Sequence, residues 1–168
     1  MSILARRATA LDIALLVEMM EEFYNEANYS LDYQWAVRSF TGLFANEANG
    51  AVWIVDVASE PAGYIVLTLH FSMEYGGLSA SIDDLFVRSA CRRLGVGRVA
   101  LDALLAECRR RHVLAVQVET APDNVAAKSL YQSCGLELRD DRRETFTLRL
   151  GDGIRGTELP QEPPDCAD

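Results

Sequence analysis

Arginines and glycines in the middle of the chain have the composition of a phosphate-binding turn. Arg92 and Arg93 follow an apolar segment, and Gly95 and Gly97 stand where a helical pattern begins. The first N–H groups of a helix lack partners inside it, and the helix dipole places partial positive charge at that end. Because glycine allows a phosphate to approach these N–H groups and arginine adds full charge, the segment predicts a pyrophosphate cradle.

Two other interpretations of this segment remain open. A helix entry with a solvated arginine face needs no ligand, and a mononucleotide could bind at the same helix terminus. Two familiar phosphate-binding motifs do not fit, however. The chain has no G-x-x-x-x-G-K-[S/T] loop, and the pattern G-x-G-x-x-G is not completed after Gly97.

The residues around this turn resemble a known signature. Residues 85–87 (Leu-Phe-Val), followed by Arg92, Gly95 and Gly97, are similar to the acetyl-CoA-binding motif of the GCN5-related N-acetyltransferases, the GNAT superfamily. A second match runs from Asn124 through Tyr131 and on to 134–137 (Cys-Gly-Leu-Glu). Residues 82–87 (Ile-Asp-Asp-Leu-Phe-Val) resemble the diamine and polyamine branch and related small-amine enzymes.

This resemblance implies acetyl-CoA as the cosubstrate and no metal. In the family, two parallel strands splay apart and the pantetheine arm enters the gap between them. Backbone groups of Leu85 and Val87 would hold the arm, and amides of residues 93–98 would hold the pyrophosphate. The complete set of implied cofactor-binding residues is Leu85, Phe86, Val87, Arg92, Arg93, Leu94, Gly95, Val96, Gly97, Arg98, Asn124, Ala127 and Lys128.

The implied reaction is direct attack of a neutral amine on the thioester carbonyl. Tyr131 stands where the family places the acid that protonates the departing thiolate, although packing alone would also explain a tyrosine there. The Leu85 N–H is the candidate donor to the tetrahedral oxyanion. Asp83 is the expected base, acting directly or through water, because it shares a strand face with Leu85 unless a bulge intervenes. Glu74 and a water chain are the alternatives to Asp83 as the base. Asp84, on the other face of the strand, would instead satisfy neighbouring backbone or arginine groups.

An acidic first helix suggests a cationic acceptor. Glu22 and Tyr24 belong to this helix, and Glu74 ends a later strand, so we expect these three residues to bind the substrate. A solvated face of an amphipathic helix would also explain any single glutamate. The expected function is acetylation of a primary amine on a small cationic metabolite. A protein or peptide amine is an alternative acceptor, and a non-catalytic acyl-CoA-binding sensor module is the alternative from another class.

The resemblance implies an α/β (or α+β) GNAT fold: a mixed sheet of six to seven strands, with splayed parallel central strands, flanked by four helices. The order of elements along the chain agrees with it. Two helices are expected to start at the caps Thr9 and Ser30. A third is expected over 97–111, and a fourth from 123 or 124 to 134, where Gly135 ends it. A turn is expected at 60–63. The expected strands are 3–7, 51–57, 64–74, 81–87, 113–118 and 145–150. Residues 1–150 form one predicted domain, and 151–168 an acidic, solvated tail.

Composition narrows the class of protein. The chain has 168 residues and a formal charge of −9, which argues against a nucleic-acid partner. No apolar stretch suits a membrane span, and no signal peptide is evident. The 4 cysteines are far apart and the histidines number 2, so reduced thiols in a cytoplasmic protein are expected rather than zinc ligands. A homodimer is common in the resembled family.

Overall fold

A mixed five-stranded sheet forms the centre of the molecule, with strand order β1-β3-β4-β5-β6. The structure, a computed structural model, describes residues 2–139, 148 and 157–158. The first four strands of this order pair antiparallel, and β6 is parallel to β5. The strands are β1 (Ile3–Arg7), β3 (Gly50–Val57), β4 (Glu60–Ser72), β5 (Gly77–Val87) and β6 (Ala115–Val118).

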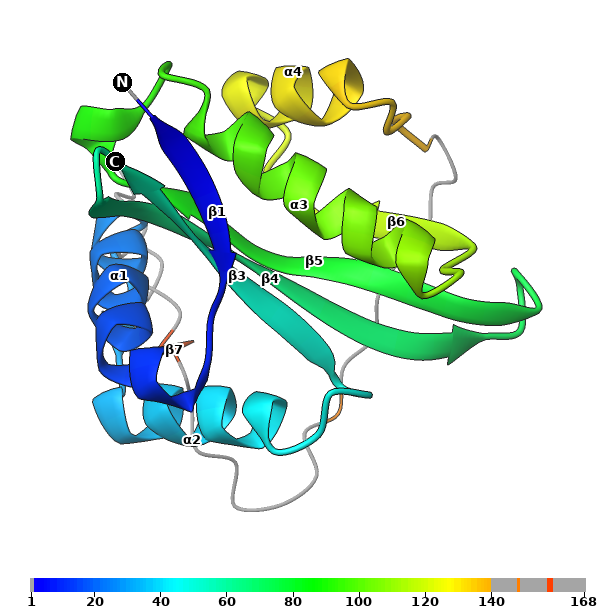
Figure 1. Cartoon of the computed structure of the whole chain (residues 1–168), viewed down its shortest axis with the longest axis horizontal. Helices are drawn as coiled ribbons and strands as arrows, with labels where there is room; N and C mark the ends of the chain where they lie inside the picture. The colour runs from blue at the N-terminus through cyan, green and yellow to red at the C-terminus, as the bar shows by residue number, and fades with distance from the viewer. Residues whose placement is uncertain (1, 140–147, 149–156, 159–168) are drawn as a thin grey trace, which may run out of the picture.

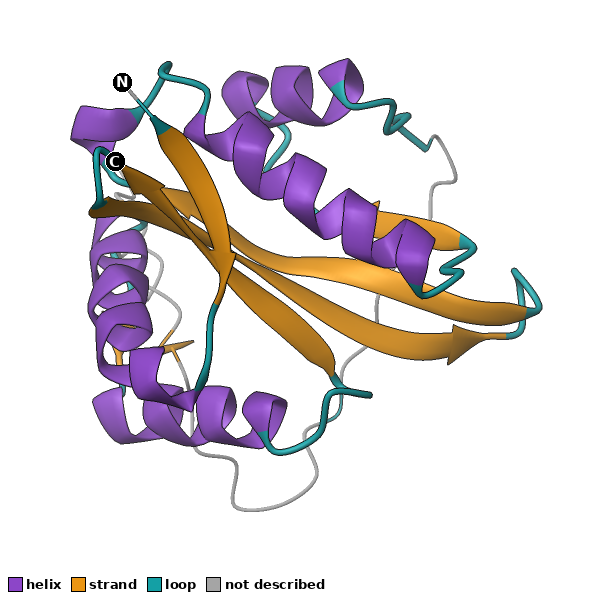
Figure 2. Cartoon of the chain, in the orientation of Figure 1, coloured by secondary structure: helices purple, strands orange, loops and turns teal. Residues whose placement is uncertain are grey.

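Two pairs of helices cover the two faces of the sheet (Figures 1 and 2). The helices α1 (Ile13–Glu26) and α2 (Tyr33–Phe44) lie on one face, and α3 (Val96–Arg110) and α4 (Val125–Ser133) on the other. The expected α/β fold with four helices is therefore confirmed. The strand count differs, because the described part of the central sheet holds five strands rather than six to seven.

The alternation of side chains along β3 supplies both cores. Ala51, Trp53 and Val55 join the apolar cluster under α3 and α4, whereas Val52 and Ile54 join the cluster under α1 and α2. Successive side chains of a strand point to opposite faces, so a strand between two helical layers must be apolar throughout. The 0% exposure of Val52, Ile54 and Val55 shows that both layers close over the sheet.

The turn between β3 and β4 lies earlier than predicted. Ala58 and Ser59 both have positive φ, at 51° and 71°, and β4 begins immediately afterwards at Glu60. The turn expected at 60–63 is therefore wrong. A two-residue hairpin turn needs positive φ at both central positions, which Asn and Gly usually supply, so Ala-Ser gave no signal of it.

Side-chain caps explain where the first helices start. The Thr9 side chain accepts from Leu11 N at 3.3 Å and starts a short 3-10 helix, η1 (Ala10–Asp12), that leads into α1. Ser30 does not cap α2, contrary to expectation. It belongs to β2 (Ser30–Leu31), and the Asp32 carboxylate caps α2 by accepting from Trp35 N at 3.0 Å.

The end of the chain is described only in part. The strand expected at 145–150 falls outside the described residues apart from residue 148. Further on, β7 (Thr157–Glu158) pairs antiparallel with β2. The domain boundary at residue 150 stays a prediction. Of the helices that the structure describes, none is both long and apolar enough to cross a bilayer.

Candidate active site

The parallel strand β6 covers only the first part of β5. Pairing between β5 and β6 ends at Ile82 and Val118, and β5 continues from there to Val87. Within the described part of the chain, no strand pairs with this end of β5 on the β6 side. The sheet therefore opens where the resemblance predicts splayed strands.

The hydrogen bonds of β5 show which backbone groups face this opening. The Arg88 N–H donates to the Ala62 carbonyl of β4 at 2.9 Å. Because N–H directions alternate along a strand, those of Leu85 and Val87 point away from β4, toward the opening. The Phe86 N–H points to β4, and its ring is buried against α1, so this residue supports the site from behind.

The turn after β5 exposes the first amides of α3. Gly95 caps the helix with a φ of 94°, and Arg93 also has positive φ, at 63°. Left-handed residues in a turn can direct successive N–H groups toward one side, which forms an anion-binding concavity. Val99 N–H donates to Gly95 O at 3.0 Å, which leaves the amides of residues 96–98 without helical acceptors.

Close packing explains the second glycine of this turn. A Cβ on Gly97 would lie 3.0 Å from Leu130 Cδ2 of α4 and 3.9 Å from Val87 Cγ2 of β5. Glycine thus allows α3 to approach both α4 and β5 at the opening. Of the other predicted residues here, Val96 is buried in the core and Leu94 is exposed on the turn.

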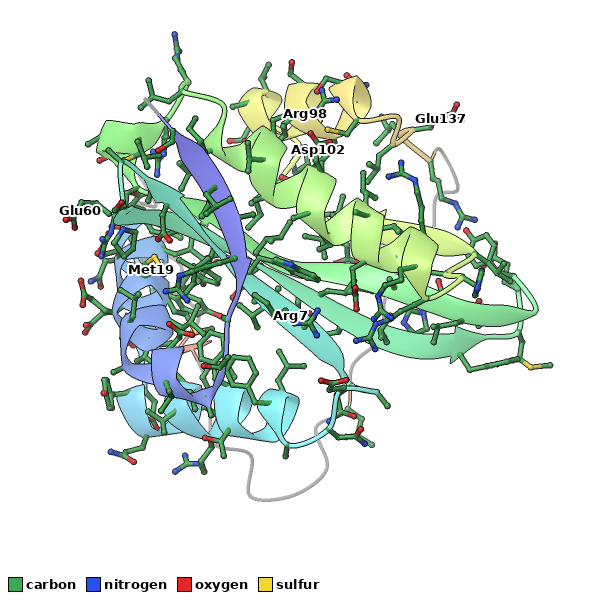
Figure 3. All side chains as sticks on the ribbon, in the orientation of Figure 1. Arg7, Met19, Glu60, Arg98, Asp102 and Glu137 are labelled. Carbon is green, nitrogen blue, oxygen red and sulfur yellow. The ribbon has the colours of Figure 1, made fainter. Side chains whose placement is uncertain are left out.

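The arginines of the turn brace it against its neighbours. Arg92 donates to the Val87 carbonyl at 2.9 Å and pairs with Glu26 of α1. Arg98 pairs with Asp102 of the same helix at 3.1 Å (Figure 3). Arg98 also donates to the Ser133 carbonyl of α4. These bonds preorganise the turn, and Arg93 is exposed beside it.

The start of α4 holds the remaining predicted cofactor residues. Asn124 Oδ1 accepts from Ala127 N at 3.1 Å, and so caps the helix. The Lys128 ammonium donates to the Pro122 carbonyl in the preceding turn. The side chains of Asn124 and Lys128 therefore shape the entry to α4.

Tyr131 lies on α4 with its ring in the core under α3 and α4. It is 9% exposed, and burial raises the pKa of its hydroxyl. The residue lines a groove of about 940 Å³ along β6, which Lys128 and Gln132 also border. A phenol that stays protonated at neutral pH suits a general acid, which is the role that the resemblance implies for Tyr131.

A separate cavity lies between the sheet and the helices α1 and α2. Its volume is about 320 Å³. The sheet contributes side chains from β4 and β5, and the aromatic residues come from the two helices. The complete lining is Met20, Tyr24, Trp35, Ser39, Phe40, Leu43, Asn49, Val66, Thr68, Asp83 and Asp84.

A β-bulge brings two adjacent carboxylates to this cavity. Val66 pairs with Asp84 and Leu67 with Ile82, so Asp83 is an extra residue of β5. The bulge breaks the simple alternation on which the expected position of Asp83 depended. As a result Asp83 and Asp84 both line the cavity, with Asp83 exposed and Asp84 partly buried.

Asp84 is held by a buried tyrosine. The Tyr64 hydroxyl, in a side chain with 0% exposure, donates to Asp84 Oδ2 at 3.1 Å. Burial raises the pKa of Asp84 to about 6, and the nearby Asp83 charge adds to this, while the Tyr64 hydrogen bond opposes it. Burial, together with the charges of Asp84 and Asp83, also raises the pKa of Tyr24 to about 12. The cavity thus combines a titratable carboxyl with the protonated phenol of Tyr24, and the Tyr64 hydroxyl holds the carboxyl from the core.

Two of the predicted acceptor-binding residues are engaged in ion pairs away from this cavity. Glu22 pairs with Arg88 at 2.6 Å, and Glu74 pairs with Arg139 at 3.0 Å. Tyr24 does line the cavity. The acidic helix α1 therefore braces the arginines after β5, and the carboxylates that face the cavity come from β5.

Sequence reasoning missed several lining residues. Neither Trp35 and Phe40, which line the cavity, nor Tyr64, which holds Asp84 from behind it, was predicted as a site residue. A tyrosine among the aliphatic residues of a buried strand was one available signal, because its hydroxyl needs a partner there. Among the described residues, no group of three or more His, Cys, Asp or Glu is placed to hold a metal ion.

Comparison with known proteins agrees with this geometry. Residues 13–136 match the model of the acetyltransferase (GNAT) family, so the chain belongs to that family and is an acetyltransferase. No curated protein matches the sequence. An integron cassette protein from the mobile metagenome of Cole Harbour Salt Marsh is 37% identical, with a TM-score of 0.78 over 89% of this chain and 92% of that one.

More distant structures share the fold. A protein described as a predicted acetyltransferase with acetyl-CoA, from Clostridium acetobutylicum, is 17% identical, with a TM-score of 0.73 over 86% of this chain and 96% of that one. An aminoglycoside acetyltransferase from an uncultured soil metagenomic sample, in complex with trehalose, is 18% identical. Its TM-score is 0.71 over 88% of this chain and 97% of that one.

Proposed function

We propose that this protein transfers the acetyl group of acetyl-CoA to a primary amine on a small cationic metabolite. The observation that carries the proposal is the opening beyond Ile82 and Val118, which has a helix N-terminus at one end and two carboxylates beside it. Such a site would bind three features: an extended arm that needs backbone partners, an anionic group and a cationic amine. Acetyl-CoA and an amine supply all three.

The cofactor would bind along the end of β5. The pantetheine arm would pair with the outward N–H groups of Leu85 and Val87, as an added strand does. The pyrophosphate would rest on the amides of residues 96–98, close to Arg93. Leu85 follows Asp84 directly, and consecutive Cα atoms are about 3.8 Å apart, so the thioester would lie next to the carboxylates.

The reaction begins with loss of a proton from the ammonium group to a carboxylate of β5. Asp83 is the base expected from the sequence, and the structure adds Asp84 as a second candidate. The amine lone pair then attacks the thioester carbon, and the oxyanion accepts a hydrogen bond from the Leu85 N–H. Collapse re-forms the carbonyl and breaks the C–S bond, and the thiolate takes a proton from Tyr131. The attacking nitrogen loses its second proton to water, and the Tyr131 phenolate regains a proton from solvent.

The partly buried carboxyl favours catalysis over mere binding of acyl-CoA. Placing Asp84 out of water raises its pKa to about 6, which costs stability that a binding module has no reason to lose. We place the reaction in the cytoplasm, where Cys91, Cys108 and Cys134, free in this structure, stay reduced. We also propose a homodimer, as is common in the resembled family, and the mass of the protein in solution tests this.

Release of CoA, measured with DTNB over a panel of amines, tests the proposal. We expect turnover with at least one small primary amine and none with tertiary amines. Tight binding of acetyl-CoA with no turnover on small amines, peptides or aminoglycosides would favour the sensor module. Turnover confined to peptides would favour a protein amine as acceptor.

Variants test the assigned roles. Tyr131→Phe should lower kcat about tenfold or more and leave the Kd for acetyl-CoA within about twofold, because only the departing thiolate needs the hydroxyl. Unchanged kcat at every pH would remove Tyr131 from the acid role. Asp83→Asn and Asp84→Asn separate the two candidate bases, since only loss of the true base abolishes the acidic limb of the pH profile.

A further inference from the structure

The charged residues in the lining of the cavity under α1 and α2 lie at one place, and this limits which acceptor the cavity can bind. Among its described lining residues only Asp83 and Asp84 carry charge. The floor is formed by the buried side chains of Met20, Phe40 and Val66. An acceptor bound here meets carboxylates at one place and uncharged groups elsewhere.

The strand registers show where that charge lies. Asp84 pairs with Val66, next to Leu85 and the opening for the cofactor. Thr68 lies two residues further along β4, and Thr68 pairs with Gly50, which follows Asn49. At about 3.4 Å per residue, Thr68 is about 7 Å from the carboxylate end. Among the described residues, the end of the cavity away from the cofactor is therefore lined by a hydroxyl and an amide, without a counter-charge.

The aromatic residues suit a body attached to an amine. Trp35 and Phe40 of α2 and Tyr24 of α1 bring three rings to the cavity. Aromatic side chains contribute large apolar area with well-defined geometry. These rings, together with the apolar floor, favour hydrocarbon over a second solvated charge.

Resting on the function proposed above, we propose that the acceptor is a primary amine whose body is uncharged and mainly apolar, bound with its amine at Asp83 and Asp84 and its body toward Thr68. A diamine that fits the same length would place its second ammonium beside Thr68 and Asn49. Burying a charge without a partner is costly, so such a diamine binds less well.

A matched pair of substrates tests this. Hexylamine and 1,5-diaminopentane have equal chain length and differ only in a terminal methyl or ammonium group. We expect kcat/KM for hexylamine to exceed that for 1,5-diaminopentane at least tenfold at pH 8, with most of the difference in KM. Equal values, or a preference for the diamine, would overturn the proposal.

A charge placed in the lining should change this preference. Ser39 lines the cavity from α2 and is exposed, so Ser39→Asp adds a carboxylate with little risk to folding. We expect it to improve the diamine relative to hexylamine at least fivefold. Thr41→Asp is the matched control, because Thr41 lies on the same helix outside the lining and bonds the helix backbone as Ser39 does. An equal effect of both variants would contradict the assigned cavity.

The two proposals can fail separately. Acetylation of diamines, aminoglycosides or peptides but not of hexylamine would overturn the acceptor class and retain N-acetyl transfer. Binding of acetyl-CoA without transfer to any amine, hexylamine included, would overturn both. Turnover of hexylamine with the expected response to Ser39→Asp supports both.

Discussion

The Asp84 carboxyl lies between the Tyr64 hydroxyl, which donates to it, and the Asp83 carboxyl, which repels its charge. Its pKa of about 6 is above the ordinary value of 3.8. The native state therefore retains a proton that the unfolded chain releases, and stability falls as pH rises from about 4 to 6. Above pH 6 this loss is complete, so Asp84 destabilises the protein at neutral pH.

Removal of this charge should stabilise the fold. We expect Asp84→Asn to raise the free energy of unfolding by about 1–3 kcal/mol at pH 8 and by clearly less at pH 4.5, measured by urea denaturation. Asp102→Asn is the control, because Asp102 is exposed on α3 and pairs with Arg98. A gain in the free energy of unfolding that does not change with pH would show that burial does not raise the pKa of the Asp84 carboxyl.

Tyr64 should set the pH dependence of catalysis if Asp84 is the base. Activity then rises with pH as Asp84 loses its proton, and the Tyr64 hydrogen bond stabilises the charged form. We expect Tyr64→Phe to move the acidic limb of kcat/KM to higher pH. A lower rate with an unmoved limb would mean that Tyr64 only packs the core, or that Asp83 is the base.

At the scale of single residues, the sequence predicted that carboxylates of β5 belong to the site but not that Asp83 and Asp84 both line one cavity. The alternation of a regular strand separates Asp83 from Asp84, and the bulge opposite Val66 and Leu67 cancels that separation. Bulges have no reliable signal in a single sequence, because they depend on the partner strand. The ion pairs of Glu22 and Glu74 were hidden for the same reason, since their arginine partners are distant in the chain.

At the scale of elements, the approach of α3 to α4 and β5 controls the proposed pyrophosphate site. Gly97 lies in the first turn of α3, where any side chain meets Leu130. We expect Gly97→Glu to raise the Kd for acetyl-CoA at least tenfold, because its side chain and charge would occupy the anion site. Calorimetric titration measures this, and far-UV circular dichroism should show a folded protein.

Gly42→Glu is the matched control for this prediction. Gly42 lies in α2, and a Cβ there would meet nothing within 4 Å. The control adds the same charge to a helix away from the opening, so affinity for acetyl-CoA should stay within about twofold. Equal affinity for Gly97→Glu and the unmodified protein would show that the pyrophosphate does not bind at α3.

Long periodic elements were predicted well, and their boundaries less so. β1, α1, α3 and α4 lie within a few residues of expectation, because apolar spacing and the left-handed Gly135 mark them clearly. The Ala58-Ser59 turn and the Asp32 cap were missed, since each is decided by tertiary context rather than by the usual turn or cap residue.

At the scale of the whole molecule, the order of elements follows from the strand–helix–strand unit that joins β5, α3 and β6. A parallel pair needs a long crossover, and α3 provides it. The resemblance to GNAT enzymes predicted the splayed strands, which no pattern in the chain shows by itself. The acceptor cavity could not be predicted, because its lining comes from four elements and the turn before β3, whose packing no local pattern specifies.

The crystal structure of the protein with acetyl-CoA tests the central claim most directly. The account predicts the pantetheine arm beside β5, bonded to backbone groups of Leu85 and Val87, and the pyrophosphate on the amides of residues 96–98. The acetyl group should point toward Asp83 and Asp84. Acetyl-CoA bound at another face, or an opening that stays closed by the protein's own side chains, would contradict it.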